Sequence, residues 1–160
     1  MLKNSLLLGF FFLIVAVTSC SKQGVYDEGV QMAIDEAKID KWADSIGLDL
    51  QKHESGLYYE VISEGEGSSP VLTDSLIVEY EARKLGDSIS FSKADDINPY
   101  KFLLRNSIEA WRIGLPMIKE GGRIRLLVPS PLGYRNYDVG NVPKNTVLDF
   151  TIDFIEIVKD

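Results

Sequence analysis

The sequence predicts an α+β fold in which a twisted antiparallel β-sheet is covered by one short α-helix and preceded by an N-terminal helix. Three observations favour this class. The 160 residues are 45% hydrophobic and 26% charged, the composition of about one ordinary globular domain. Near Ser55 the hydrophobic period changes from helical spacing to a spacing of two. Beyond that point, clusters of Gly, Pro, Asn and Asp separate short runs, as turns separate antiparallel strands.

Before Ser55, one segment has the spacing of an amphipathic helix. Its apolar residues fall on one helical face; they are Met32, Ile39, Ala43 and Ile46, with Trp42 beside them. Gly47 is a plausible end of this helix. We expect the helix to pack on the domain, although the same periodicity also fits a helix that binds a partner or dimerises.

The strands are expected where apolar and polar residues alternate, and the expected ranges are 57–62, 76–83, 88–91, 100–104 and 123–128. A last strand places Leu148, Phe150, Ile152 and Phe154 on one face. Ile155 and Ile157 then follow the opposite phase. This change predicts a bulge near Phe154 and Ile155, or burial of both faces.

A short helix is expected between the strands at 100–104 and 123–128. Asn106 or Ser107 can cap its N-terminus, and Pro116 should end it. Ile108, Trp111 and Leu115 then share one face. The long segment 129–145 reads as a loop, and loops of this length in compact domains are usually functional or disordered.

The N-terminus reads as a targeting segment. After Lys3, residues 6–17 are apolar except for Gly9, too short a run for a comfortable membrane span and typical of a signal peptide. Val17-Thr18-Ser19-Cys20 resembles the lipobox of bacterial lipoproteins and ends on the only Cys of the chain. A short anchor with an incidental Cys, or cleavage by an ordinary signal peptidase, is the alternative.

This interpretation divides the chain into a lipoprotein signal peptide (1–19), a lipidated tether with the N-terminal helix (20–54) and a folded domain (55–160). Membrane attachment is expected through lipidated Cys20. The expected location is the bacterial cell envelope, with the domain facing the periplasm, at the outer membrane. Ser21-Lys22-Gln23 carries no acidic residue directly after the Cys that would act as a sorting signal.

Charge and residue counts exclude several kinds of chemistry. The 24 Asp and Glu against 17 Lys and Arg give a net charge of −7, which disfavours nucleic acid as a partner. One Cys and one His cannot supply a disulfide framework or a Cys/His zinc site. Gly65-Glu66-Gly67 lacks the Lys of a phosphate loop, and Asp95-Asp96 reads as a solvated turn. We therefore expect neither a metal nor a cofactor.

Several segments resemble, in order, the FK506-binding-protein family of peptidyl-prolyl isomerases. They are 55–62 (SGLYYEVI), 78–80 (VEY), 108–111 (IEAW), 119–123 (KEGGR), 128–134 (VPSPLGY) and 142–148 (VPKNTVL). The likeness runs from about Ser55 to Val158, and with the lipobox it indicates a bacterial lipoprotein form of the family. It implies an antiparallel sheet wrapped around one short helix, with an apolar pocket between them that accepts a prolyl ring.

The resemblance also implies roles for individual residues. Trp111 forms the floor of the pocket, and the aromatic walls are Tyr80, Phe91, Phe150 and, at a position that is often Phe, Tyr100. Ser107 and Ile108 match the stretch that leads into the helix. The backbone N–H of Ile108 and the hydroxyl of Tyr134 match two donors to the carbonyls of a bound peptide. Phe102 is left in the core.

The implied activity is peptidyl-prolyl cis-trans isomerisation on proline-containing segments of exported proteins, with an FK506-like compound as a possible ligand. Ser92 stands where the family usually carries Asp just after Phe91. Tyr80 to Phe91 is one residue longer than usual, and Asn141 and Lys144 also depart from the pattern. A non-catalytic peptide-binding or chaperone module is therefore the alternative, and a purely structural envelope lipoprotein is a third.

Overall fold

The computed structural model describes residues 25–158. The predicted signal peptide and Cys20 lie outside the described residues. Within the described part of the chain, no helix combines the length and apolar character needed to cross a membrane.

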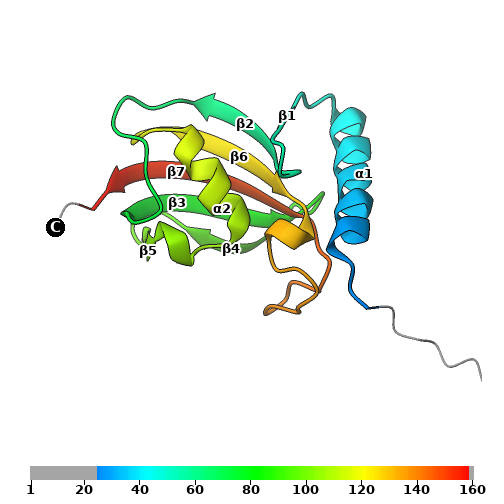
Figure 1. Cartoon of the computed structure of the whole chain (residues 1–160). Coiled ribbons are helices and arrows are strands. Elements are labelled where there is room, and N and C mark those ends of the chain that lie inside the picture. The colour runs from blue at the N-terminus through cyan, green and yellow to red at the C-terminus, as the bar shows by residue number, and fades with distance from the viewer. Residues whose placement is uncertain (1–24, 159–160) are drawn as a thin grey trace, which may run out of the picture.

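The described chain forms one antiparallel sheet, two α-helices and three 3₁₀ turns (Figure 1). In chain order the elements are α1 (Glu28–Ile46), β1 (Gln51–Lys52), β2 (Tyr58–Ser63), β3 (Ser75–Lys84), β4 (Ser90–Ala94), β5 (Tyr100–Leu103), η1 (Leu104–Asn106), α2 (Glu109–Gly114), η2 (Leu115–Met117), β6 (Arg123–Val128), η3 (Ser130–Leu132) and β7 (Leu148–Ile157). The strand order is β1-β2-β6-β7-β3-β4, and β5 pairs with β3 beyond the end of β4. The predicted α+β class is confirmed.

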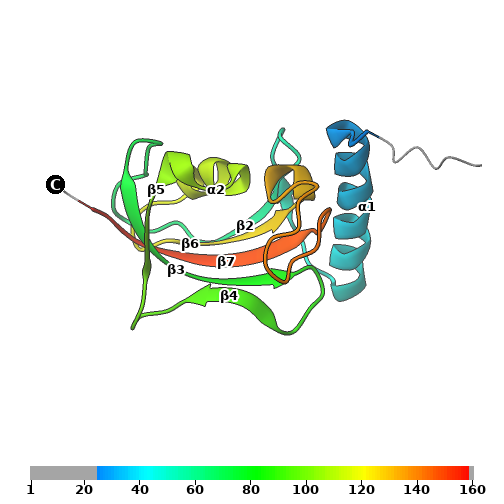
Figure 2. The same ribbon diagram turned by 90° about the horizontal axis from the view of Figure 1, so that it is seen from below.

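The core lies between α2 and one face of the sheet (Figure 2). Alternating residues of β3, β6 and β7 supply it; they are Leu76, Val78 and Ala82, then Ile124, Leu126 and Val128, and then Leu148, Phe150, Ile152 and Phe154. At Gly114, a Cβ atom would lie 2.7 Å from the Leu126 side chain. A glycine at this position therefore lets α2 approach the sheet closely.

One register shift accounts for the phase change along β7, and one expected strand has other limits. Val78 pairs with Phe154 and Ile77 with Glu156, so Ile155 is an extra residue on β7 and the predicted bulge is confirmed. The strand expected at 88–91 is wrong in its limits, because the structure has β4 at Ser90–Ala94. The Asp87 N–H donates to the Lys84 carbonyl across a turn in which Gly86 has φ +82°, and pairing starts only after Ile89.

The expected N-cap of the short helix is also wrong. Ile108 caps α2, with no side-chain hydrogen bond at that position. The preceding residues form the separate turn η1, and the Ser107 hydroxyl donates to the Leu104 carbonyl of that turn at 2.7 Å. Ser107 is thus already engaged upstream and does not cap α2. The α-helical part ends at Gly114, and Pro116 lies in the 3₁₀ turn that follows.

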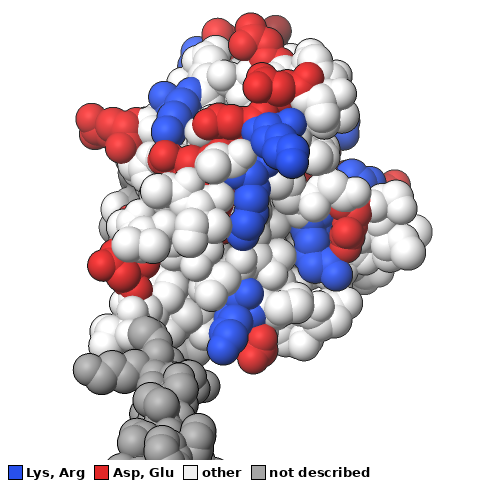
Figure 3. Space-filling model, turned by 90° about the vertical axis from the view of Figure 1, so that its right-hand side faces the viewer, with Lys and Arg blue, Asp and Glu red and all other residues white. Residues whose placement is uncertain are grey.

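The predicted N-terminal helix exists and packs on the domain. It ends at Gly47, which adopts the left-handed conformation with φ +66°. The expected buried face is confirmed at Ile39 and Ala43, and Met32 is partly buried against the core. It is wrong at Ile46, which is 55% exposed, and the buried face also includes Gln31 and Asp35. Ile39 packs with residues of β2, β6 and the loop before β7, which are Tyr58, Leu127 and Val147. On this side of the molecule, Lys and Arg side chains lie among Asp and Glu side chains (Figure 3).

The segment 129–145 is an ordered connection between β6 and β7. It begins with the buried turn η3, and Val139 and Val142 form a small antiparallel bridge further along. In Figures 1 and 2, η3 lies between α2 and α1. The loop therefore joins the N-terminal helix to the side of the core that α2 covers.

Candidate functional site

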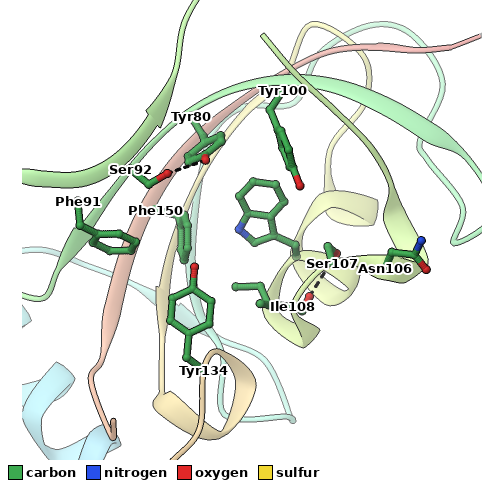
Figure 4. A pocket seen from close by; sticks show the side chains of 10 residues that line it. Tyr80, Phe91, Ser92, Tyr100, Asn106, Ser107, Ile108, Tyr134 and Phe150 are labelled. Atoms are coloured by element: carbon green, nitrogen blue, oxygen red, sulfur yellow. Dashed lines mark hydrogen bonds between the residues drawn. The ribbon is translucent and has the colours of Figure 1, made fainter. Parts of the chain in front are cut away.

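One pocket of about 200 Å³ opens beside α2 (Figure 4). Its lining contains all eight residues that the sequence assigned to a site within the described range; they are Tyr80, Phe91, Tyr100, Ser107, Ile108, Trp111, Tyr134 and Phe150. Ser92 and Asn106 complete the lining. The structure thus brings together residues from four strands (β3, β4, β5 and β7), the entry to α2, α2 itself and the long loop.

Trp111 of α2 is the central ring of this pocket and is 5% exposed. Its ring centroid lies 5.3 Å from that of Tyr80, 5.5 Å from Phe150 and 6.3 Å from Tyr100, all in edge-to-face geometry. Phe102 stacks on Tyr100 at 5.1 Å and packs against the core without lining the pocket. Interlocking aromatic edges and faces hold the Trp111 indole in one orientation.

A bulge in β4 brings two neighbouring residues to the pocket. Ala82 pairs with Ser92 and Arg83 with Ser90, which leaves Phe91 as the extra residue. Strict alternation would send Phe91 and Ser92 to opposite faces, whereas the bulge lets both side chains line the pocket.

Ser92 forms the polar part of the wall. Its hydroxyl lies 2.8 Å from the Tyr80 hydroxyl (Figure 4). Asp95 accepts from the Asn98 N–H, pairs with Lys93 and does not line the pocket. No residue that lines the pocket is charged at neutral pH.

The pocket holds unused hydrogen-bond donors, among them the buried Trp111 indole N–H, which has no partner in the described part of the chain. In residues 25–158, no acceptor takes the Ile108 N–H or the Tyr134 hydroxyl. Burial raises the pKa of Tyr134, and the neighbouring Tyr80 and Tyr100 raise it further. The Tyr134 hydroxyl therefore keeps its proton at neutral pH and can donate to a carbonyl of a bound molecule.

This arrangement suits binding of an apolar ring and its adjoining carbonyls. The aromatic faces exclude water, while hydrogen bonds from the Ile108 N–H and the Tyr134 hydroxyl can orient the bound molecule. Among residues 25–158, no three His, Cys, Asp or Glu side chains gather in a way that could hold a metal ion.

Ser92 and Asn106 line the pocket without having been predicted as site residues. Ser92 follows Phe91 directly, so its position beside a wall residue was the available signal. Asn106 appeared in the sequence only as a possible helix cap. Asn141 and Lys144, which depart from the family pattern, do not line the pocket.

Comparison with known proteins agrees with this geometry. The family model described as FKBP-type peptidyl-prolyl cis-trans isomerase matches residues 66–155, more than half of the chain. The chain is 34% identical over 104 residues to a probable isomerase of this type, FkpA, from Neisseria meningitidis, covering 64% of this chain and 38% of the relative. It is 35% identical over 111 residues to FkpA from Aeromonas hydrophila, covering 69% and 41%.

A solved structure of an FkpA protein is also similar to this chain. The crystal structure of FkpA from Escherichia coli superposes with a TM-score of 0.69 at 28% identity, covering 81% of this chain and 62% of that one. The chain spans less than half the length of the two relatives above. The sequence and the fold both match, and segments that resemble the family contribute residues to the pocket. The chain belongs to the FKBP-type peptidyl-prolyl cis-trans isomerase family.

Proposed function

We propose that the protein catalyses cis-trans isomerisation of X–Pro peptide bonds in this pocket. The observation that carries the proposal is the uncharged aromatic cavity around Trp111, with unused donors at Ile108 and Tyr134. Chains related over the matched segment carry the name FKBP-type peptidyl-prolyl cis-trans isomerase.

The chemistry needs no nucleophile. Rotation about the X–Pro bond has a barrier of about 18–20 kcal/mol because amide resonance is lost in the twisted state. Transfer of the bond into an apolar pocket weakens that resonance, since the charge-separated form loses hydration. A pocket that binds the twisted imide better than either planar isomer lowers the barrier, by tenfold in rate for each ~1.4 kcal/mol.

Each predicted residue has a role in this scheme. The prolyl ring rests on Trp111 and lies within walls formed by Tyr80, Phe91, Tyr100 and Phe150. The Ile108 N–H and the Tyr134 hydroxyl donate to peptide carbonyls beside the proline. Ser107, whose hydroxyl donates to the Leu104 carbonyl, helps to shape the entry to α2 on the substrate side. An FK506-like compound is a candidate inhibitor of the same cavity.

The proposed substrates are proline-containing segments of exported proteins. Lipidated Cys20 is proposed to hold the domain at the bacterial envelope, facing the periplasm at the outer membrane, after removal of residues 1–19. Residues 20–54 then form the tether and α1, and residues 55–160 the isomerase domain. Several acyl chains on one Cys bind a membrane more firmly than a single chain does.

The test of catalysis measures cis-trans exchange in an X–Pro peptide by NMR with the full chain in detergent. Catalysed exchange that FK506 inhibits is the expected result. Exchange at the uncatalysed rate at high protein concentration would overturn the catalytic proposal. Tyr134→Phe, which removes one donor and leaves the ring, identifies the pocket as the source of the rate.

The second candidate function is binding of proline-containing peptides without catalysis. The neutral Ser92–Tyr80 contact favours it, because the carboxylate usual at the Ser92 position is missing from the pocket. A peptide that binds with a measurable Kd but exchanges at the uncatalysed rate would support this module. Absence of both binding and exchange would leave the structural-lipoprotein hypothesis.

The anchor has a separate test. Cells that express the parent chain or Cys20→Ala are labelled with a fatty acid, and the label on the protein is compared. Label only on the parent chain is expected. Equal label on both proteins would refute attachment through Cys20.

A further inference from the structure

We propose that α1 positions two donors of the pocket, the Tyr134 hydroxyl and the Ile108 N–H. It does so through a set of contacts that we call the α1 clamp: those of Asp35 with Ser130, and those of Arg135 with Glu28 and Glu109. Asp35 and Arg135 are then positioning residues that act on Tyr134 and on the Ile108 segment. The inference deepens the proposed function of the pocket and rests on it. It concerns a helix that lies before residues 66–155, the range of the family match.

Asp35 is the centre of the clamp. Its side chain is fully buried on the face of α1 that meets η3. Its Oδ2 accepts both the Ser130 N–H, at 2.9 Å, and the Ser130 hydroxyl, at 2.5 Å. Its Oδ1 accepts from Gln31 and Lys38, each at 2.9 Å. A buried carboxylate with four donors fixes its neighbours in direction as well as in distance.

Ser130 transmits this constraint to Tyr134 over a short path. Ser130 begins η3, whose three residues are all buried. The Ser130 carbonyl accepts the Arg135 N–H at 2.7 Å, which closes the chain into a compact loop that contains Tyr134. A shift of Ser130 relative to the sheet therefore moves the Tyr134 ring at the pocket.

Arg135 connects the same loop to the second donor. It adopts φ +57°, unusual for a residue with a side chain. Its guanidinium lies 3.3 Å from Glu28 of α1 and 3.7 Å from Glu109 of α2. Glu109 directly follows Ile108, whose N–H is the second of these two donors. All three charged side chains are partly exposed, so we expect this half of the clamp to contribute less than Asp35.

The test is a double-mutant cycle on the full chain, with kcat/KM for an X–Pro peptide as the readout. Asp35→Ala should lower kcat/KM about three- to tenfold, the range expected when one hydrogen bond is lost from the transition state. In a Tyr134→Phe background the same change should lower it less than twofold, because the hydroxyl that Asp35 positions is already absent. A merely structural effect of Asp35 would be the same in both backgrounds.

Asp40→Ala is the matched control. Asp40 also lies on α1 and accepts a hydrogen bond, but from Tyr58 of β2 and not from the loop of the pocket. It should weaken docking of α1 without changing kcat/KM by more than twofold. Asp35→Asn keeps one oxygen for Ser130 and should recover most of the loss. Circular dichroism and tryptophan fluorescence verify that each variant is folded at the assay temperature.

If Asp35→Ala does not fold, Ser130→Ala takes its place in the cycle, because it removes only one of the two bonds. Equal losses in both Tyr134 backgrounds, or equal effects of Asp35→Ala and Asp40→Ala, would overturn the clamp while the proposed function stands. A wild-type chain without isomerase activity would overturn the catalytic proposal. The clamp is then judged from peptide Kd and from the amide NMR shifts of Ile108 and Tyr134, which should move in Asp35→Ala and stay in Asp40→Ala.

Discussion

The aromatic pocket and the α1 clamp lie on either side of the same loop and are held together by different forces. In the pocket, uncharged side chains surround Trp111 and pack edge to face. In the clamp, a fully buried carboxylate at Asp35 accepts four hydrogen bonds, two of them from Ser130. Tyr134 connects the two regions, because its ring lines the pocket and it lies between Ser130 and Arg135, which the clamp ties to α1.

The difference shows how stability and positioning are divided in this domain. Apolar packing contributes free energy in proportion to buried area and depends weakly on direction. Hydrogen bonds to a buried carboxylate contribute less net free energy but require one geometry. We therefore expect changes in the pocket floor to act mainly on stability, and changes at polar contacts to act on activity or on pH dependence.

The largest expected effect is that of Trp111→Ala. Removal of a buried indole leaves a cavity and costs about 3–5 kcal/mol of unfolding free energy. The matched change is Trp42→Ala on α1, where the Arg125 Cζ atom lies 5.4 Å from the centroid of a partly exposed indole ring. The expected cost of that change is below about 2 kcal/mol of unfolding free energy. Urea unfolding measures both. Equal costs at the two tryptophans would show that the pocket floor stabilises the domain no more than a partly exposed ring on α1 does.

The next effect concerns pH and the contact between α1 and β2. Burial, and then the hydrogen bond to Asp40, raise the pKa of Tyr58 to about 12. The protonated form is thus favoured in the folded state over the unfolded state, whose tyrosine pKa is about 10. The contribution is complete below about pH 10 and is lost as the pH rises through about 12, by roughly 2–3 kcal/mol in total.

This pH dependence is measured as the difference in unfolding free energy between the wild type and Tyr58→Phe. That difference should shrink by about 1.4 kcal/mol between about pH 9 and about pH 11. A difference independent of pH would show that Tyr58 does not ionise differently in the two states.

A smaller effect is expected from Tyr134→Phe, which removes a donor and leaves the ring. The value of kcat/KM for an X–Pro peptide should fall about three- to tenfold, since one hydrogen bond to the bound peptide is lost. The unfolding free energy should change by less than about 0.5 kcal/mol, because no described residue accepts from this hydroxyl. A large loss of stability with unchanged activity would contradict this role.

The smallest effect is expected from Ser92→Asp. A carboxylate in place of the Ser92 hydroxyl, which lies 2.8 Å from Tyr80, makes a hydrogen bond about twice as strong as a neutral one. We expect kcat/KM to rise about two- to threefold, measured against Ser92→Ala as the control. No change in either variant would show that the Tyr80 contact does not affect turnover.

Some features of the site and the fold could be predicted from the sequence, and others could not. Trp111, Tyr134 and the aromatic walls followed from ordered segments that resemble a known family, and the structure brings them around one pocket. The bulge at Ile155 followed from a phase change along one strand. The N-cap at Ile108 did not follow, because Ser107 is engaged by the preceding turn and only the fold of that turn reveals it.

The buried face of α1 shows the same limit. Periodicity found the helix and its end at Gly47, but it assigned Ile46 to the buried face and could not recognise Asp35 as buried. A charged residue reads as exposed until a partner is known, and Ser130 lies 95 positions further along the chain.

The sequence by itself determined the fold class, the alternating strands, the family and the side chains available to the pocket, because period, turn residues and ordered motifs are local properties of the chain. Tertiary structure decided which residues come together. The bulge in β4 brings both Phe91 and Ser92 to the pocket, and the hydrogen bonds of Asp35 join α1 to the loop that contains Tyr134. Such contacts depend on the long-range register of strands and on desolvation of a polar group by distant partners, and neither is encoded in any short segment.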